Sequence, residues 1–207
     1  MPGRLITIEG LDGAGKTTLA AGLLDAIRAA GRPAELLREP GGVEVAERLR
    51  ALVKDPELHV GARAEALIYA AARAQLVEEA LRPLLEDGTW VLLDRFVDSS
   101  LAYQGGGRAL GVAAIAELNR FATGGLEPDR TLYLRIDPTL GRARTGARLE
   151  GFDRLEREGD PFFEAIARTY DELAAADPAR IRVLDAAQAP QAVLDDALAA
   201  IGDLLAG

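Results

Sequence analysis

Gly10-Leu11-Asp12-Gly13-Ala14-Gly15-Lys16-Thr17 is the stretch that decides the fold class of this chain. It matches the pattern G-x-x-x-x-G-K-[ST] of loops that bind nucleotide phosphates. The apolar residues 5–8 before it predict a buried strand, and residues 16–30 after it predict a helix. Glycines let the backbone turn its N–H groups around an anion, and the helix N-terminus adds the positive end of its dipole. The stretch therefore predicts a strand–loop–helix unit that binds a polyphosphate.

The side chains of this loop fit a nucleoside triphosphate bound with Mg²⁺. Lys16 would supply a positive charge to the β- and γ-phosphates, and the Thr17 hydroxyl would be a Mg²⁺ ligand. We expect ATP to contact the consecutive residues Gly10, Leu11, Asp12, Gly13, Ala14, Gly15, Lys16, Thr17 and Thr18. The alternative is a glycine-rich turn without a ligand, but four fixed positions match by chance in a chain of this size only on the order of one time in a hundred.

Apolar strands alternate with helices along the rest of the chain. Further strands are expected at residues 34–37, 90–94, 131–136 and 181–184. Helices are expected at residues 44–53, 63–85, 99–103, 112–121, 162–175 and 191–205. This alternation predicts an α/β fold in three layers, with a five-stranded parallel sheet flanked by helices on both faces. Because no repeat or linker interrupts it, we expect residues 1–207 to form a single domain.

The composition of the chain excludes several function classes. There is no Cys, which excludes disulfides, thiolate catalysis and Cys-ligated metal sites. His59 is the single histidine, so a multi-histidine metal site is excluded and a Ser-His-Asp triad has no matching context. The net charge of −9 lacks the basic surplus of proteins that bind duplex nucleic acid or anionic membranes, so we expect neither partner.

The sequence also bears on location. No run of about 18 apolar residues occurs, so no transmembrane helix is expected. Residues 1–4 lead directly into the first predicted strand and do not resemble a signal peptide. We therefore expect a cytoplasmic protein.

Asp94 and Arg95 stand where the apolar run of residues 90–94 ends. Because the carboxyl ends of parallel strands meet at one edge of a sheet, both side chains should emerge beside the phosphate loop. Asp94 then fits a position near Mg²⁺ or its water ligands. The alternative is a charged pair that only ends a strand. A guanine-reading N-K-x-D segment is absent, which favours a small-molecule kinase over a GTPase switch.

Tyr69 and Arg73 are four residues apart in the helix predicted over residues 63–85, so they share one face. A ring that stacks on a base, with a guanidinium one turn away for a base carbonyl, fits a base-reading pair. A core tyrosine beside a surface arginine is the alternative, and the spacing alone favours this alternative.

Residues 141–158, which we call the lid, are rich in arginine: Arg142, Arg144, Arg148, Arg154 and Arg157. One interpretation is a mobile segment that closes arginine side chains over a transferring phosphoryl group. The other is a solvated helical hairpin whose ion pairs contribute little to stability. The spacing does not separate the two.

Four motifs together resemble the thymidylate kinase family, and the similarity runs nearly from end to end. They are the extended phosphate loop at residues 8–18, the turn Arg38-Glu39-Pro40-Gly41-Gly42, the segment 94–104 with its Asp-Arg, Ser and Ala-Tyr spacing, and Asp153-Arg154-Leu155-Glu156 in the lid. Their joint occurrence is far more specific than the phosphate loop alone. The resemblance implies a homodimeric kinase that uses ATP and Mg²⁺ to phosphorylate dTMP to dTDP.

The resemblance also assigns residues to the acceptor. Tyr69 would stack on thymine and Arg73 would hydrogen-bond to it. Arg95 would hold the dTMP phosphate with help from Arg38, and Tyr103 would lie against the sugar. The rest of the implied dTMP site comprises Asp12, Glu39, Pro40, Ser99, Ser100 and Gln104.

The resemblance further implies where a catalytic arginine stands. One subdivision of the family carries it in the phosphate loop, but here Gly13 follows Asp12, so this chain resembles the subdivision whose arginine is in the lid. The implied catalytic residues are Lys16, Arg95, Arg142, Arg144 and Arg148. No general base is needed, because a phosphate monoester with a second pKa of about 6 is already mostly ionised at neutral pH.

Two alternative functions stay open at this point. One is a kinase for another nucleoside or deoxynucleoside monophosphate. The other is a nucleotide-binding regulator that kept the phosphate loop without catalysis. The candidate residues at the loop, the strand end and the lid favour the enzyme.

Overall fold

The computed structural model describes residues 3–146, 154–155 and 157–206. Within these residues the chain forms one five-stranded sheet in the order β2-β3-β1-β4-β5. Every neighbouring pair of strands is parallel. The strands are β1 (Leu5–Glu9), β2 (Ala34–Arg38), β3 (Trp90–Asp94), β4 (Arg130–Arg135) and β5 (Ile181–Asp185). The prediction of a five-stranded parallel sheet is confirmed.

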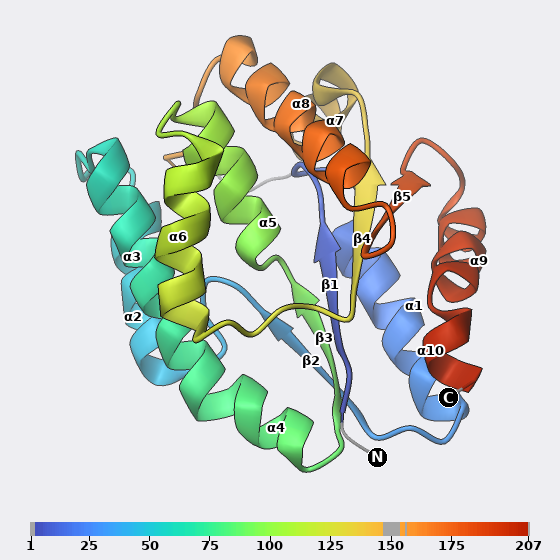
Figure 1. Ribbon diagram of the computed structural model, residues 1–207. Coiled ribbons are helices and arrows are strands. Elements are labelled where there is room, and N and C mark those ends of the chain that lie inside the picture. Colours follow the sequence, from blue (N-terminus) through green and yellow to red (C-terminus); the bar gives the residue numbers. More distant parts are fainter. Residues whose placement is uncertain (1–2, 147–153, 156, 207) are drawn as a thin grey trace.

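One face of the sheet is covered by α1 (Lys16–Ala29), α9 (Pro190–Ala200) and α10 (Gly202–Ala206) (Figure 1). The apolar stripe of α1, which includes Leu19, Leu23 and Ile27, is buried in the main hydrophobic core. Its spacing of four residues keeps these side chains on one side of the helix.

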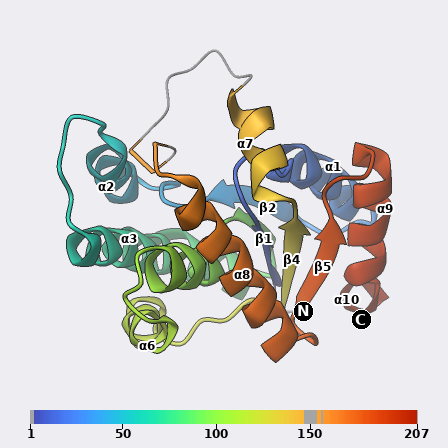
Figure 2. The same ribbon diagram turned by 90° about the horizontal axis from the view of Figure 1, so that it is seen from above.

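The opposite face carries a thicker layer of helices, visible from above in Figure 2. It contains α3 (Ala62–Leu76), η1 (Val77–Leu81), α4 (Arg82–Glu86), α5 (Val97–Ser100), η2 (Leu101–Gly107), α6 (Val112–Thr123) and α8 (Asp160–Ala176), with α2 (Glu44–Lys54) packed against α3. Helices on both faces explain why β1 is buried along its whole length. The three-layer α/β/α prediction is confirmed.

The extents of some predicted helices need correction. The helix expected over residues 191–205 is divided into α9 and α10. Residues 63–85 were expected to form one helix, but the structure divides this segment into α3, the π-helical turn η1 and α4. Pro83 follows shortly after η1, and Leu81 and Arg82 before it keep helical dihedral angles, so the three pieces form one continuous helical run. Proline has no N–H to donate to the preceding turn, and a wider π-helical turn commonly stands where the regular hydrogen-bond ladder is broken. The start of the lid is helical, in α7 (Pro138–Gly146), which agrees with the helical part of the hairpin interpretation.

The carboxyl ends of three strands converge on one place. Ile8 of β1 is level with Asp94 of β3, and Arg38 of β2 is level with Asp94 on the other side. Two backbone hydrogen bonds extend this register past the strand ends, from the Arg95 amide to the Ile8 carbonyl at 3.0 Å and from the Glu39 amide to the Asp94 carbonyl at 2.9 Å. The phosphate loop, Arg95 and the turn after β2 therefore lie side by side.

None of the helices in the described ranges is both long enough and apolar enough to cross a membrane.

Candidate active site

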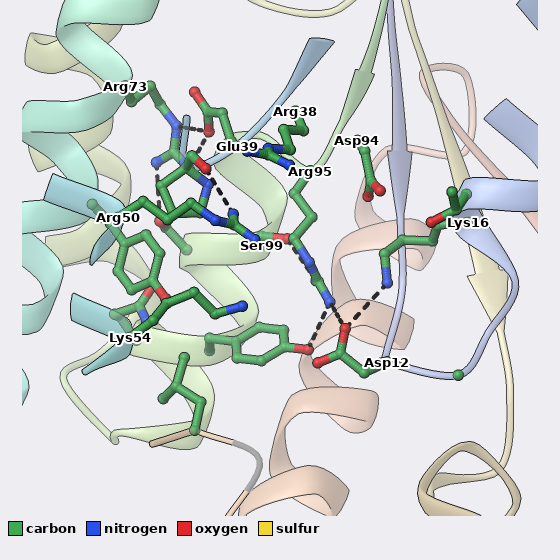
Figure 3. Close-up of a pocket in the computed structure, with 18 of the residues that line it drawn as sticks. Asp12, Lys16, Arg38, Glu39, Arg50, Lys54, Arg73, Asp94, Arg95 and Ser99 are labelled. Carbon is green, nitrogen blue, oxygen red and sulfur yellow. Dashed lines mark hydrogen bonds and ion pairs between the residues drawn. The ribbon is translucent and has the colours of Figure 1, made fainter. Parts of the chain in front are cut away.

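A cavity of about 310 Å³ opens at this edge of the sheet (Figure 3). It brings together the residues predicted for the acceptor: Asp12, Arg38, Glu39, Pro40, Tyr69, Arg73, Arg95, Ser99, Ser100, Tyr103 and Gln104. The lining also includes residues that were predicted to bind ATP or Mg²⁺, namely Gly13, Gly15, Lys16, Thr17, Thr18 and Asp94. Of the remaining loop residues, Leu11 and Ala14 are buried in the core cluster and so anchor the loop from behind.

The phosphate loop depends on glycine where the backbone passes close to its neighbours. Gly10 has φ of 138° and Gly13 has φ of 81°, a region that favours glycine. A Cβ on Gly13 would lie 2.3 Å from the Gly141 carbonyl oxygen, and one on Gly10 would lie 2.5 Å from that of Leu134. Glycine is therefore required at both positions. The loop leads directly into α1 at Lys16, so the helix N-terminus faces the cavity.

Lys16 is held inside the loop by the backbone. Its Nζ donates to the carbonyl oxygens of Gly10 at 3.2 Å and Leu11 at 3.0 Å, and it lies 3.6 Å from Asp12 Oδ1. Burial lowers the pKa of Lys16, the charge of Arg95 lowers it further, and the Asp12 carboxylate opposes both. The ammonium is thus positioned before any phosphate arrives.

Arg95 joins the loop to the end of β3. Its guanidinium donates to Asp12 Oδ1 at 2.7 Å, the Gly10 carbonyl at 3.1 Å and Ser99 Oγ at 3.1 Å. It also lies over the Tyr103 ring, 5.1 Å from the centroid. Burial alone would raise the pKa of Asp12, but Arg95 and Lys16 hold it well below its usual range. Asp12 is therefore an ionised carboxylate between two fixed cations.

Glu9, the last residue of β1, supports the turn that carries Arg95. Its carboxylate accepts hydrogen bonds from the Phe96 amide at 2.7 Å, Ser99 Oγ at 2.6 Å and the Tyr170 hydroxyl at 2.8 Å. Burial raises the pKa of Glu9 to about 7, and the charge of Asp98 adds to this effect. Sequence reasoning did not identify Glu9 as functional, although an acid at the end of a buried strand was a usable signal.

Arg73 is buried, with only 2% of its surface exposed, so the alternative of a surface arginine is wrong. Its Nε donates to Glu39 Oε2 at 2.7 Å, and its other N–H groups reach the Phe96 carbonyl and Ser100 Oγ, both at 2.9 Å, and Asn119 Oδ1. In this structure Arg73 therefore ties together the walls of the cavity. Its hydrogen bond to thymine stays a prediction.

Two oxygen atoms at the edge of the cavity lack a hydrogen-bond partner among the described residues. They are Asp94 Oδ1 and Glu39 Oε1, and both are buried. A buried carboxylate oxygen without a donor is costly unless a ligand completes it. Asp94 and the exposed Thr17 of the loop both line the cavity, and their oxygen atoms fit Mg²⁺, which prefers carboxylate, hydroxyl and water oxygens.

Helix α2 adds two cations that sequence reasoning did not assign to the site, Arg50 and Lys54. Arg50 donates to the Pro40 carbonyl at 2.7 Å, and Arg38 on the neighbouring turn donates to Glu47 at 2.9 Å. The four-residue spacing of Arg50 and Lys54, in the helix that follows the Glu39-Pro40 turn, was the signal in the sequence.

The lid arginines that the structure describes do not line this cavity. Arg142 donates to Asp160 at 2.5 Å and lies over the Phe163 ring, whereas Arg144 donates to the Ala186 carbonyl at 3.0 Å. Arg142 lines a second cavity of about 350 Å³, together with Arg157 of the lid and with Leu11 and Asp12 of the phosphate loop. The predicted Arg148 lies outside the described residues. The structure does not bring Arg142 or Arg144 into contact with the acceptor cavity.

The far end of the lid is tied to α3 through Glu65, which sequence reasoning missed. This fully buried carboxylate accepts hydrogen bonds from Arg154 at 2.5 Å, Arg108 at 3.2 Å and Gln104 at 2.9 Å. Gln104 also lines the acceptor cavity. The hydrogen bonds of Glu65 therefore connect the cavity wall to the end of the lid.

The loop has the glycine pattern of loops that bind phosphates, and Arg95 joins it to the cation-rich part of the cavity formed by the turn after β2 and by α2. This arrangement is typical of phosphate-loop proteins of the nucleotide kinase class. The sequence model of the family "Thymidylate kinase" matches residues 8–197. The chain belongs to the thymidylate kinase family, as the sequence motifs indicated.

Individual relatives agree with this assignment over nearly the full length. A thymidylate kinase of Halorhodospira halophila is 47% identical over 205 residues, covering 98% of this chain and 95% of that one. One of Lactobacillus delbrueckii subsp. bulgaricus is 48% identical and covers 93% of each chain. One of Deinococcus radiodurans is 46% identical and covers 89% of each.

Proposed function

We propose that this protein transfers the γ-phosphoryl group of ATP to dTMP, producing dTDP and ADP for dTTP biosynthesis. The observation that carries the proposal is the Asp12–Arg95 contact of 2.7 Å, which fastens the phosphate loop to a second cation-rich half-site. A donor polyphosphate on the loop and an acceptor monophosphate on Arg95 would then be neighbours. The thymidylate kinase family supports dTMP as the acceptor.

The donor half-site would hold ATP by the loop amides, the N-terminus of α1 and Lys16. Thr17 and, through a water, Asp94 would hold Mg²⁺, consistent with the unpartnered Asp94 Oδ1. When bound, Mg²⁺ neutralises charge on the β- and γ-phosphate oxygens. Lys16 would move from the loop carbonyls to these oxygens, an exchange of one set of acceptors for another.

The acceptor half-site would hold dTMP by its three parts. Tyr69 would stack on the thymine ring and Arg73 would read it, together with Ser100 and Gln104, since all four residues line the cavity. Tyr103, whose ring is fixed by Arg95, would lie against the deoxyribose. Arg95 would hold the phosphate, and Arg38 would assist from the turn after β2.

Catalysis would consist of positioning and charge neutralisation. The acceptor oxygen is already ionised at neutral pH, so no side chain has to remove a proton. Arg95 and Asp12 would fix the acceptor side and Lys16 the donor side, so that the attacking oxygen and the γ-phosphorus would be presented in line.

One or more of the lid residues Arg142, Arg144 and Arg148 would neutralise the moving phosphoryl group. Because Arg142 and Arg144 contact Asp160 and Ala186 away from the cavity, this role requires the lid to rearrange when both nucleotides are bound. A catalytic arginine of this kind contributes roughly 10³ to 10⁵ in rate.

We also propose a homodimer in the cytoplasm, which the family suggests. Exposed apolar side chains on the outer helices offer a surface for a second copy, namely Leu67 of α3, which is 58% exposed, and Phe121 of α6, which is 88% exposed. Large apolar side chains in such positions are favoured at interfaces between subunits. Sedimentation velocity at micromolar concentration tests the dimer, and a monomer would contradict it.

An acceptor panel tests the proposed reaction. Purified protein is given ATP and Mg²⁺ with dTMP, dUMP, dCMP, dGMP or thymidine, and diphosphate and ADP formation are measured. We expect dTMP to give the highest kcat/KM and thymidine to give no product. A higher value for another monophosphate would show a different kinase, and tight ATP binding without product from any acceptor would show a non-catalytic regulator.

A further inference from the structure

Lys54 is the last residue of α2, and it lines the acceptor cavity. The helix packs against α3, which carries Tyr69 and Arg73, so its C-terminal end opens onto the acceptor half-site. In Figure 3 the Lys54 side chain extends into the cavity from the α2 side, and its ammonium points toward the guanidinium of Arg95. This is the half-site to which the proposed function assigns the dTMP phosphate.

The charge of Lys54 acts across the cavity on the phosphate loop. Together with Arg95 and Lys16, it lowers the pKa of Asp12, although burial opposes them. Lys54 therefore lies within Coulombic range of the Asp12–Arg95 pair, the place where the two half-sites meet. Because Lys54 belongs to α2, its charge acts from a wall of the cavity that is formed by neither the phosphate loop nor β3.

Lys54 differs from the neighbouring arginines, Arg50 and Arg73, in how its hydrogen-bond donors are held. Arg50 donates to the Pro40 carbonyl at 2.7 Å, and Arg73 donates to Glu39 at 2.7 Å. Lys54 has an interaction partner in the chain as well. An ammonium, however, carries three donors on a flexible stem with no fixed geometry. It can keep its contact and still donate to a phosphate oxygen.

We propose that Lys54 is an acceptor-binding residue whose ammonium holds the 5′-phosphate of the monophosphate from the α2 side, while Arg95 holds it from the β3 side. This role rests on the proposed function, because it needs dTMP in the cavity. The chemical reason is the meeting of two polyanions in a protein of net charge −9. A cation on each side of the acceptor phosphate reduces its repulsion from the donor.

The test compares binding of dTMP with binding of thymidine, which lacks the phosphate, by titration calorimetry without ATP. The variants are Lys54→Gln, which removes the charge, and Lys54→Arg, which keeps it. Arg48→Gln is the matched control, because Arg48 lies on the same helix with 78% of its side chain exposed and pairs with Glu44 outside the cavity. Thermal unfolding of each variant verifies that the fold is retained.

We expect Lys54→Gln to weaken dTMP binding about tenfold, as loss of a charge-assisted hydrogen bond does, and to leave thymidine binding unchanged. Lys54→Arg should stay within about threefold of the wild type, and Arg48→Gln should match the wild type. Equal weakening for dTMP and thymidine, no weakening for either, or an equal loss in both Lys54 variants would overturn the role.

The same titrations distinguish a wrong acceptor site from a wrong role of Lys54. If the wild-type protein binds dTMP no more tightly than thymidine, the proposed acceptor site itself is wrong. If the wild type prefers dTMP and Lys54→Gln keeps the same preference, the acceptor site stands and only the role of Lys54 is wrong.

Discussion

The sheet edge and the lid hold their arginines in different ways. Arg95 and Arg73 at the sheet edge are buried or nearly so, and several protein acceptors fix each guanidinium. Arg142 and Arg144 in the lid are exposed, and their contacts lie away from the acceptor cavity. The arginines at the sheet edge are therefore already positioned to bind a ligand, whereas the lid arginines have to change position before they can contact one.

The largest effect on activity is expected from the lid arginines. Alanine at Arg142, Arg144 and Arg148, one at a time, should lower kcat by about 10³ to 10⁵ at one or more positions, about 4–7 kcal/mol of transition-state stabilisation. The melting temperature should change little, because exposed ion pairs contribute little to stability. Steady-state kinetics and thermal unfolding measure both. A change in kcat below about tenfold at all three positions would remove the lid from the mechanism.

Replacing Arg73, which buried partners hold in place, should instead lower the stability of the fold. Arg73→Ala should lower the free energy of unfolding by about 3–5 kcal/mol, because it leaves Glu39 buried without its partner. Urea denaturation measures this loss. The control is Arg63→Ala on the same helix, where the exposed side chain predicts a change within about 0.5 kcal/mol. Equal losses in both variants would show that Arg73 does not hold the cavity walls together.

A smaller, pH-dependent effect is expected at Glu9, which supports the turn that carries Arg95. Its folded pKa of about 7 lies above the unfolded value of 4.5, so folding favours the protonated form. Stability from this group is therefore complete below pH 4.5 and is lost as the pH rises through 7. Glu9→Gln resembles the protonated acid, and the hydroxyls of Ser99 and Tyr170 can rotate to accept from its amide.

The free energy of unfolding of Glu9→Gln minus that of the wild type should thus be larger at pH 8 than at pH 5, by up to about 3 kcal/mol. Urea titrations of both proteins at the two pH values give this difference, and groups that titrate alike in both proteins cancel. A difference that is the same at both pH values would show that Glu9 is ionised in the fold throughout this range.

The smallest effect should come from the phenol of Tyr103. Tyr103→Phe keeps the ring against Arg95 and removes only a hydroxyl that lies 3.3 Å from the guanidinium. We expect kcat/KM for dTMP to fall by less than about tenfold, since a single long hydrogen bond is lost. A fall of a hundredfold or more in kcat/KM would mean that the hydroxyl of Tyr103, and not its ring, makes the main contribution to the reaction.

The sequence predicts the sheet edge better than the lid, and the reason is physical. A strand, a glycine loop and a helix N-terminus are local features, and parallel strands bring their carboxyl ends together, so the loop, Asp94 and Arg95 were placed beforehand. The partners of Arg73 could not be predicted in this way. They come from the turn after β2, from α5 and from α6, and they meet only in the folded chain.

The same limit explains Glu65 and Lys54. Glu65 is buried because Arg108 and Arg154, distant in sequence, surround it, whereas its neighbours in the chain give no sign of this. Lys54 ends a helix whose position beside the cavity depends on the packing of α2 on α3. For the lid, the sequence shows which residues carry charge, but their partners depend on the lid's position.

The central claim is that one cavity presents dTMP to the γ-phosphate of ATP. The most direct measurement is the ratio of dTDP to ADP formed by the purified protein with ATP and Mg²⁺, with and without dTMP. We predict one dTDP for each ADP when dTMP is present, and almost no ADP without it. ADP release at the same rate in both conditions, or no dTDP at all, would contradict the claim.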